Sequence, residues 1–267
     1  MKVLAVIGSP RKQGNTFRVV DQIKAKLQEL DQALEFEYLF VNDCNLRMCM
    51  GCFLCISHGA EKCPLKDDRD AIAAKMSEAE GIIFAAPTYA KGVPRLMKNF
   101  IDRFAYTCHR PAFFHKAFLA VTTIGGSMGM KLALEQLSIL AGGGKVVKKL
   151  GVSMPPIPMA GYTNKAEKGI ASAARAFYGA LSKGQPKLPG FSDWGWFHSF
   201  RALCAFPAYQ KACPADYAYY SEKQEYFYPL EGRFLRRLLG KLIGAMMRFS
   251  FRFIVKSEES APFNTPL

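Results

Sequence analysis

The fold is decided by the opening stretch KVLAVIGSPRKQGNT, which spans residues 2–16. Residues 2–7 form a short, β-branched apolar run that ends at Gly8-Ser9-Pro10, and such a run is typical of a strand buried in a parallel sheet. Between Thr16 and Leu30, apolar residues recur at spacings of three and four, which predicts a helix with one buried face. The stretch therefore predicts a strand, a glycine-containing turn and a helix in direct succession.

The same succession of strand and helix repeats further along the chain. Further strands are expected at residues 34–41, 80–86, 117–123 and 146–152, and further helices from near Asp67 and at residues 94–104, 127–141 and 164–181. Strands that alternate with helices predict parallel βαβ units and a sheet covered on both faces. We therefore expect an α/β fold with a doubly wound, five-stranded parallel sheet, in which ligands bind beyond the carboxyl ends of the strands.

Three loops follow strands at this predicted edge. The first, residues 8–16, offers backbone N–H groups to a phosphate, although an ordinary capped turn has similar residue types. It lacks both the Gly-Lys-Ser/Thr end of a Walker loop and the G-x-G-x-x-G pattern of a dinucleotide loop. The second, residues 87–94, carries a tyrosine that can stack on a planar ring. The third, residues 124–130, contains Gly125 and Gly126, where backbone can approach a flat ligand. Together the loops predict a site for a phosphorylated planar ligand.

Length, composition and charge narrow the class of protein. The chain has 267 residues, 50% of them hydrophobic, which suits one large domain or one domain with an appendage. It has no uncharged apolar run of about 18 residues, and its first residues are too weakly apolar for a signal peptide, so we expect a cytoplasmic protein. The formal net charge of +14 favours polyanionic partners. No nucleic-acid motif accompanies this charge, so we expect no nucleic-acid partner.

Four of the eight cysteines form a compact group. Cys49, Cys52, Cys55 and Cys63 follow a C-x2-C-x2-C-x7-C spacing, with a proline after the last one. In a reducing compartment, such clustering favours metal or redox chemistry over disulfides. Four thiolates in this order can enclose an iron–sulfur cubane, and ferredoxins use similar triplets. Zinc also binds four thiolates, although three closely spaced cysteines are less usual for it.

The ordered motifs resemble those of one protein family. The loop Gly-Ser-Pro-Arg-Lys-x-Gly-Asn-Thr, the cysteine segment that ends in Asp67-Asp68, Ala-Pro-Thr-Tyr and Lys-Asn-Phe-Ile-Asp-Arg look like the NADPH-dependent FMN reductase and iron–sulfur flavoprotein branch of the flavodoxin-like proteins. The resemblance covers about residues 1–155 and implies a flavodoxin-like fold. By resemblance, the FMN phosphate would be held by Ser9, Arg11, Asn15 and Thr16. The isoalloxazine would be lined by Pro87, Thr88, Tyr89 and Ala90, and its other side would be closed by Gly125 and Gly126.

The resemblance also implies an activity. Members of this branch take hydride from NAD(P)H onto FMN and pass electrons on; the flavin carries the chemistry, so no side-chain acid or base is assigned. We expect an FMN-dependent NAD(P)H oxidoreductase that forms a homo-oligomer, such as a dimer, and reduces a small-molecule or protein acceptor: a quinone, a flavin or an iron–sulfur partner. The alternative is an electron carrier that binds FMN without oxidising nicotinamide.

The resemblance leaves two interpretations of the cysteine segment. Iron–sulfur flavoproteins show a closely similar motif, which would make Cys49, Cys52, Cys55 and Cys63 the ligands of a 4Fe-4S cluster. Flavin reductases of the same branch can look alike in this segment without carrying a cluster.

The composition changes after Lys183, which predicts a domain at residues 1–183 and a C-terminal extension at 184–267. Residues 184–230 are rich in aromatic residues, which we expect to pack on the first domain or to shape the mouth of its pocket, from the same or a second subunit. Ordinary core packing is the alternative for most of them. Residues 231–256 hold seven basic residues against one acid. On a helix, six of the seven fall on one arc, opposite an arc of apolar residues. This profile is typical of a helix in a membrane interface, and also of a helix packed on protein with a solvated basic face.

Overall fold

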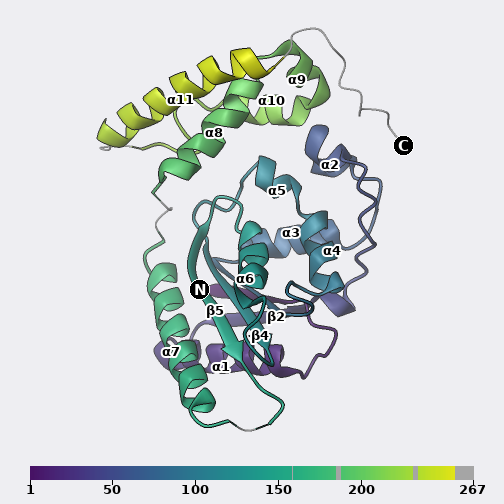
Figure 1. Ribbon diagram of the computed structural model, residues 1–267, viewed down its shortest axis with the longest axis vertical. Coiled ribbons are helices and arrows are strands. Elements are labelled where there is room, and N and C mark those ends of the chain that lie inside the picture. The colour runs from purple at the N-terminus through teal and green to yellow at the C-terminus, as the bar shows by residue number, and fades with distance from the viewer. Residues whose placement is uncertain (158, 185–187, 231–233, 256–267) are drawn as a thin grey trace. The chain divides into compact units, whose positions relative to one another are not determined.

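The computed structural model describes residues 1–157, 159–184, 188–230 and 234–255 (Figure 1). The chain divides into two compact units. The first unit comprises Met1–Cys49 and Leu65–Lys187, and the second unit comprises Met50–Pro64 and Leu188–Leu267. Most of the cysteine segment therefore shares a unit with the C-terminal extension.

The first unit is built on one parallel sheet. Its strands are β1 (Lys2–Ile7), β2 (Glu35–Phe40), β3 (Gly81–Pro87), β4 (Ala117–Ile124) and β5 (Lys145–Ser153). They lie in the order β2-β1-β3-β4-β5, and every neighbouring pair is parallel. The five strands predicted from the sequence are confirmed, and each end agrees within one residue. The chain leaves β1 toward β2 on one side and later returns to β3 on the other, which creates a topological switch point between β1 and β3.

Helices connect these strands. In the first unit they are α1 (Asn15–Leu30), α3 (Arg69–Glu78), α4 (Arg95–Arg103), α5 (Tyr106–His109), α6 (Met130–Ile139) and α7 (Tyr162–Leu181), with a 3-10 turn at Val41–Asp43. The helix expected at 127–141 is shorter than predicted. It begins after Gly129, whose φ of 88° lies in the left-handed region and cannot belong to the helix.

The two faces of the sheet are buried under different helices, as Figure 1 shows. Val3, Ala5 and Ile7 of β1 pack with α1 and α7, whereas Leu4 and Val6 pack with α3, α4 and α6. This alternation follows from the two-residue period of a strand and explains why β1 is apolar throughout. The first unit is therefore a doubly wound, flavodoxin-like α/β fold, as predicted.

The second unit is helical. Its elements are α2 (Leu54–Ser57), a 3-10 turn at Ala60–Lys62, α8 (Phe191–Leu203), α9 (Pro207–Ala212), α10 (Pro214–Ser221) and α11 (Phe234–Ile254). The short helix α2, from the cysteine segment, contacts α10. The predicted basic helix corresponds to α11; residues 231–233 and 256 of that prediction lie outside the described residues.

The aromatic residues of the extension form a core of their own. Trp194, Phe197, Phe200, Tyr220 and Ile243 are buried together in one cluster. Ring pairs within it are close; the rings of Phe200 and Tyr220 stack with centroids 5.5 Å apart. The rings of this cluster therefore bury one another within the second unit, as expected for core packing. Packing of the aromatic segment on the first domain stays a prediction.

Candidate functional site

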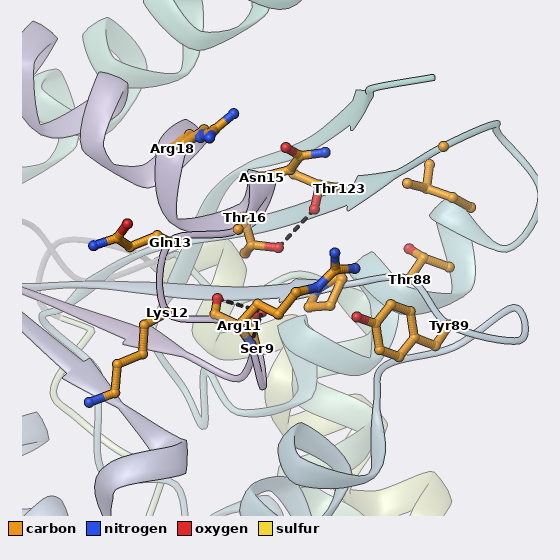
Figure 2. A pocket seen from close by; sticks show the side chains of 14 residues that line it. Ser9, Arg11, Lys12, Gln13, Asn15, Thr16, Arg18, Thr88, Tyr89 and Thr123 are labelled. Carbon is orange, nitrogen blue, oxygen red and sulfur yellow. Dashed lines mark hydrogen bonds between the residues drawn. The ribbon is translucent and has the colours of Figure 1, made fainter. Parts of the chain in front are cut away.

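A pocket of about 590 Å³ opens at the carboxyl ends of β1, β3 and β4 (Figure 2). This position is the switch point of the sheet, where doubly wound folds bind ligands. The volume lies within the range of about 300–1,000 Å³ that is usual for cofactor pockets. The pocket is lined by Ser9, Arg11, Lys12, Gln13, Gly14, Asn15, Thr16, Arg18, Pro87, Thr88, Tyr89, Thr123, Ile124 and Gly125.

The loop between β1 and α1 forms one wall of the pocket. Its start is held against the sheet by a hydrogen bond from the Gly8 N–H to the Ala85 carbonyl, 2.8 Å long. The Ser9 hydroxyl accepts from the Arg11 N–H at 3.2 Å, which closes a tight turn. Helix α1 then begins at Asn15, and its N-cap residue, Gly14, provides no side chain to cap it. The N–H groups of its first turn are therefore available to an anion, which the helix dipole also favours.

Three cations line the same pocket, and they differ in their partners. Lys12 pairs with Asp43 at 2.7 Å. The guanidinium of Arg11 reaches Tyr89 (Figure 2), and this hydrogen bond raises the pKa of Arg11. Within the described ranges, no carboxylate lies within 4.0 Å of the Arg18 guanidinium. Among the described residues, Arg18 thus has neither an ion pair, as Lys12 has, nor a side-chain hydrogen bond, as Arg11 has, to break when an anion binds. Arg18 was not predicted as a site residue, although its spacing of three from Asn15 places it on the same helix face.

Buried hydroxyl pairs fix the three loops to one another. The Thr16 and Thr123 hydroxyls lie 2.8 Å apart and join the start of α1 to the end of β4. The Thr88 and Thr122 hydroxyls are also 2.8 Å apart, and Thr122 donates to the Ala86 carbonyl. These bonds hold the pocket wall in one geometry before any ligand arrives.

The loop after β3 contains a strained turn. Tyr89 and Gly92 exchange two backbone hydrogen bonds of 2.8 and 3.0 Å around the turn. Both residues at the tip have positive φ, 47° for Ala90 and 70° for Lys91, which is unfavourable for residues with a Cβ. Gly129 packs directly against this tip, since a Cβ on Gly129 would lie 2.3 Å from the Lys91 Cα. Such strain is typical of functional sites, and here it presents the Tyr89 ring to the pocket (Figure 2).

The structure brings most of the predicted cofactor-binding residues together. The pocket-lining residues include Ser9, Arg11, Asn15, Thr16, Pro87, Thr88, Tyr89 and Gly125. Ala90 and Gly126 do not line this pocket. Ala90 occupies the tip of the strained turn, and the Gly126 carbonyl accepts a hydrogen bond from the Ser153 hydroxyl at 2.8 Å. Contacts between these residues and FMN stay predictions.

The first cysteine is anchored by α4. The Cys49 N–H donates to the Asn99 side-chain oxygen at 2.9 Å, and the Asn99 amide nitrogen donates to the carbonyls of Leu46 and Arg47. Asn99 is buried one turn before Arg103, which donates to the Arg47 carbonyl at 2.8 Å. The Lys-Asn-Phe-Ile-Asp-Arg motif therefore holds the chain that leads into the cysteine segment.

Arg103 also makes a buried ion pair with Asp67. Two hydrogen bonds of 2.5 and 2.8 Å join the side chains, which are 1% and 0% exposed. Burial alone would raise the pKa of Asp67, but hydrogen bonds from Arg103 and from the Arg47 and Arg69 N–H groups outweigh it and lower that pKa. The pair joins both ends of the cysteine segment to α4. In the sequence, Asp67 and Arg103 are visible only as parts of family motifs, and nothing there indicates that they pair.

The other three predicted ligands, Cys52, Cys55 and Cys63, lie in the second unit. None of the four is in a disulfide, and Cys63 is the buried one. The donor set has the chemistry of an iron–sulfur site. In the described part of the chain, however, no three Cys, His, Asp or Glu side chains are gathered as a metal site. The present arrangement therefore does not fit a cluster without rearrangement of the segment.

Comparison with known proteins places these features in context. A model of the NADPH-dependent FMN reductase family matches residues 1–155. An iron–sulfur flavoprotein of Methanocaldococcus jannaschii is 41% identical over 103 residues, which are 39% of this chain and 51% of that protein. An iron–sulfur flavoprotein of Clostridioides difficile is 30% identical over 183 residues, covering 66% of this chain and 78% of that protein. The chain thus spans about half the length of the first of these relatives.

A solved oxidoreductase from Corynebacterium diphtheriae has a similar fold. Its TM-score is 0.50 at 16% identity, covering 68% of this chain and 98% of that one. At this identity the likeness extends to the fold alone. The part of the chain that it leaves uncovered is about the size of the C-terminal extension.

Proposed function

The chain belongs to the NADPH-dependent FMN reductase family, and we propose that it is an FMN-dependent oxidoreductase that takes hydride from NAD(P)H and passes electrons to an acceptor. The observation that carries this proposal is the pocket at the switch point, where the uncapped start of α1 meets the Tyr89 turn. One end of the pocket suits a phosphate and the other suits a planar ring. The iron–sulfur flavoprotein relatives support a flavin as the cofactor.

The residues of the pocket have distinct tasks in this proposal. The N–H groups at the start of α1 and the loop before it would bind the phosphate, with Arg18 and Lys12 supplying positive charge. Thr88 and Tyr89 would border the isoalloxazine, and the Arg11–Tyr89 contact would join the two ends. FMN, when bound, supplies two-electron and one-electron chemistry. The protein's task is to bind and orient it.

The first experiment tests the phosphate site. Apo-protein titrated with FMN and with riboflavin should bind FMN at least about tenfold more tightly, because only FMN carries the phosphate. Asn15→Asp adds a negative charge at the start of α1 without changing side-chain size. A carboxylate suits a helix N-terminus, so the fold should persist, while FMN affinity falls about tenfold or more through repulsion. Riboflavin affinity should not change.

Asn164→Asp is the matched control for this variant. Asn164 is an exposed residue in the first turn of α7 and does not line the pocket. The same substitution there should leave both affinities unchanged. Equal binding of FMN and riboflavin by the wild-type protein would contradict the proposed phosphate site.

The second experiment separates an oxidoreductase from an electron carrier. The FMN-loaded protein is mixed anaerobically with NADPH or NADH, and flavin absorbance is followed by stopped flow. Rapid bleaching by either nucleotide is expected for the oxidoreductase, and the faster one identifies the preferred reductant. A flavin that dithionite reduces but neither nucleotide bleaches would assign the chain to the carriers instead. Steady-state assays with quinones, free flavins and iron–sulfur proteins then define the acceptor, and sedimentation velocity tests the expected homo-oligomer.

We also propose that Cys49, Cys52, Cys55 and Cys63 bind an iron–sulfur cluster once the segment rearranges around it. Their spacing and the iron–sulfur flavoprotein relatives support this. The described residues do not gather three of these thiols at one point, so the segment has to rearrange when the cluster binds. Anaerobically purified protein should contain iron and acid-labile sulfide, and Cys52→Ser should lose both while retaining FMN. Cys44→Ser, outside the spacing, is the control. Purified wild-type protein with FMN but neither iron nor sulfide would refute the cluster.

A further inference from the structure

Helix α11 packs on α8 along a side that carries two glycines. Gly240, Ile243 and Gly244 are its buried residues, and they lie against α8. A Cβ on Gly240 would lie 2.7 Å from the Trp194 ring, and one on Gly244 would lie 2.7 Å from the His198 Nδ1. The glycines are therefore needed for close contact between the two helices. This packing leaves the bulky apolar residues of α11 on other sides of the helix.

A broad apolar face of α11 is exposed. Eight large side chains on it are between 43% and 78% exposed: Phe234, Leu235, Leu238, Leu239, Leu242, Met246, Phe249 and Phe253. At about 100° per residue, they project from one arc of about 140°. Single exposed apolar residues are ordinary, but a contiguous face of this kind marks a binding surface. The helix expected from the sequence thus packs on protein with its glycine side and keeps its apolar side free.

A basic strip borders this apolar face. Arg237, Lys241, Arg248 and Arg252 project from an arc of about 60° beside it, and residues 234–254 contain no acid. Arg237 pairs with Glu225 at 2.6 Å. Within the described ranges, no carboxylate lies within 4.0 Å of the charged groups of the other three. Around the helix, the order is therefore a buried glycine side, a basic strip and an exposed apolar face.

This charge pattern decides which occupant fits the face. A second copy packed antiparallel on α11 would bring its Arg237 and Lys241 near Arg248 and Arg252, and like charges in contact are unfavourable. The chain as a whole carries a net charge of +14, which adds to that repulsion. A surface with apolar chains below a layer of negative charge matches both parts of the pattern.

We propose that α11 lies in the interface of an anionic phospholipid membrane, with its apolar face among the acyl chains and its basic strip at the phosphates. This is the arrangement of an amphipathic interfacial helix, whose affinity depends on buried apolar area and on anionic lipid. Among the helices that the structure describes, none is both long enough and apolar enough to cross a bilayer. Binding in the plane of the membrane is therefore the mode that the sequence of α11 permits.

Vesicle flotation with the full-length, FMN-loaded protein tests the proposal. The protein should float with vesicles of phosphatidylcholine mixed with phosphatidylserine, and bind at least about tenfold more weakly to phosphatidylcholine alone. Leu242→Glu, at the centre of the apolar face, should abolish flotation. The double variant Lys241→Glu, Arg248→Glu should lose the preference for phosphatidylserine.

Ile139→Glu is the matched control. Ile139 is 51% exposed on α6 in the first unit, so the same change of apolar residue to carboxylate should leave flotation unchanged. Tryptophan fluorescence and flavin content show that each variant is folded. Wild-type protein that stays with neither kind of vesicle would overturn the proposal. Normal flotation of the Leu242→Glu variant would also overturn it. If the only change in that variant were dissociation of an oligomer in sedimentation velocity, the apolar face would be assigned to a second copy instead.

Discussion

Acidification should weaken the second unit through His198. This residue is 5% exposed in α8, its ring stacks on Trp194, and its Nε2 has no hydrogen-bond partner among the residues described. Burial, together with the charges of Arg201 and Arg248, lowers the pKa of His198 from 6.5 to about 4. The folded state therefore disfavours the proton, whereas the unfolded chain accepts it.

The size and sign of the effect follow from proton linkage. Between pH 6.5 and about 4 the unfolded state binds more protons, so stability is complete above pH 6.5 and falls as the pH approaches 4. The loss from this one residue is about 3 kcal/mol in the free energy of unfolding. That amount is a large share of the stability of a small unit.

Tryptophan fluorescence isolates the second unit, because the two tryptophans of the chain, Trp194 and Trp196, both lie in α8. Urea unfolding at pH 7 and at pH 4.5 should show the loss in the wild-type protein. His198→Phe keeps a ring and cannot be protonated, so its pH dependence should be smaller by about 2–3 kcal/mol. His115→Gln, exposed in the first unit, is the control. Equal pH dependence in wild type and His198→Phe would refute the reasoning.

Three further substitutions test the first unit. Asp67→Asn should cost about 3–5 kcal/mol of stability, measured by urea unfolding followed by circular dichroism, because it leaves the Arg103 charge buried without its counter-ion. Ala90→Gly should stabilise the protein by about 1 kcal/mol in the same assay, because glycine adopts a φ of 47° without strain. Gly129→Ala should destabilise by at least about 2 kcal/mol, because its φ is 88° and its Cβ would meet the Lys91 backbone.

Matched substitutions separate these effects from general loss of stability. Asp102→Asn removes a carboxylate next to Arg103 that pairs with Lys98 on the surface, so its cost should stay below about 1 kcal/mol. If Asp67→Asn and Asp102→Asn lowered the free energy of unfolding by the same amount, burial of the Asp67–Arg103 pair would be unimportant. Gly126→Ala meets no atom within 4 Å and should be neutral, in contrast to Gly129→Ala. A destabilised Ala90→Gly would show that the turn is not strained.

The sheet was predictable because its signal is local. The strands β1, β3 and β4 are short apolar runs that end at or next to Gly or Pro, and burial on both faces removes any other period from their pattern. The loops after β1, β3 and β4 were predictable as one site because the carboxyl ends of parallel strands lie at the same edge of the sheet. The exact lining was less predictable. Ala90 lies at the tip of a two-residue turn with positive φ at both positions, which is unexpected for Ala-Lys, so its place outside the pocket lining was not visible in the sequence.

Long-range contacts account for what the sequence did not reveal. Asp67 and Arg103 are 36 residues apart, and nothing local indicates that the two charges are buried together. The core of the second unit joins residues from 194 to 247 whose spacing has no simple period. For α11, the apolar stripe was visible in the sequence. The side that packs on α8 was not, because it carries two glycines, and a hydrophobic pattern gives glycine little weight.

The composition of the pocket wall has a consequence for how flavin binding responds to acidity. The residues that line the pocket include no carboxylate, imidazole or thiol. Those are the groups that change charge between about pH 4 and 9. A phosphate monoester loses its second proton near pH 6, so the group that changes charge in this range is the phosphate of the ligand. Affinity for FMN should therefore rise with pH through that range, while the protein surface that receives it stays constant.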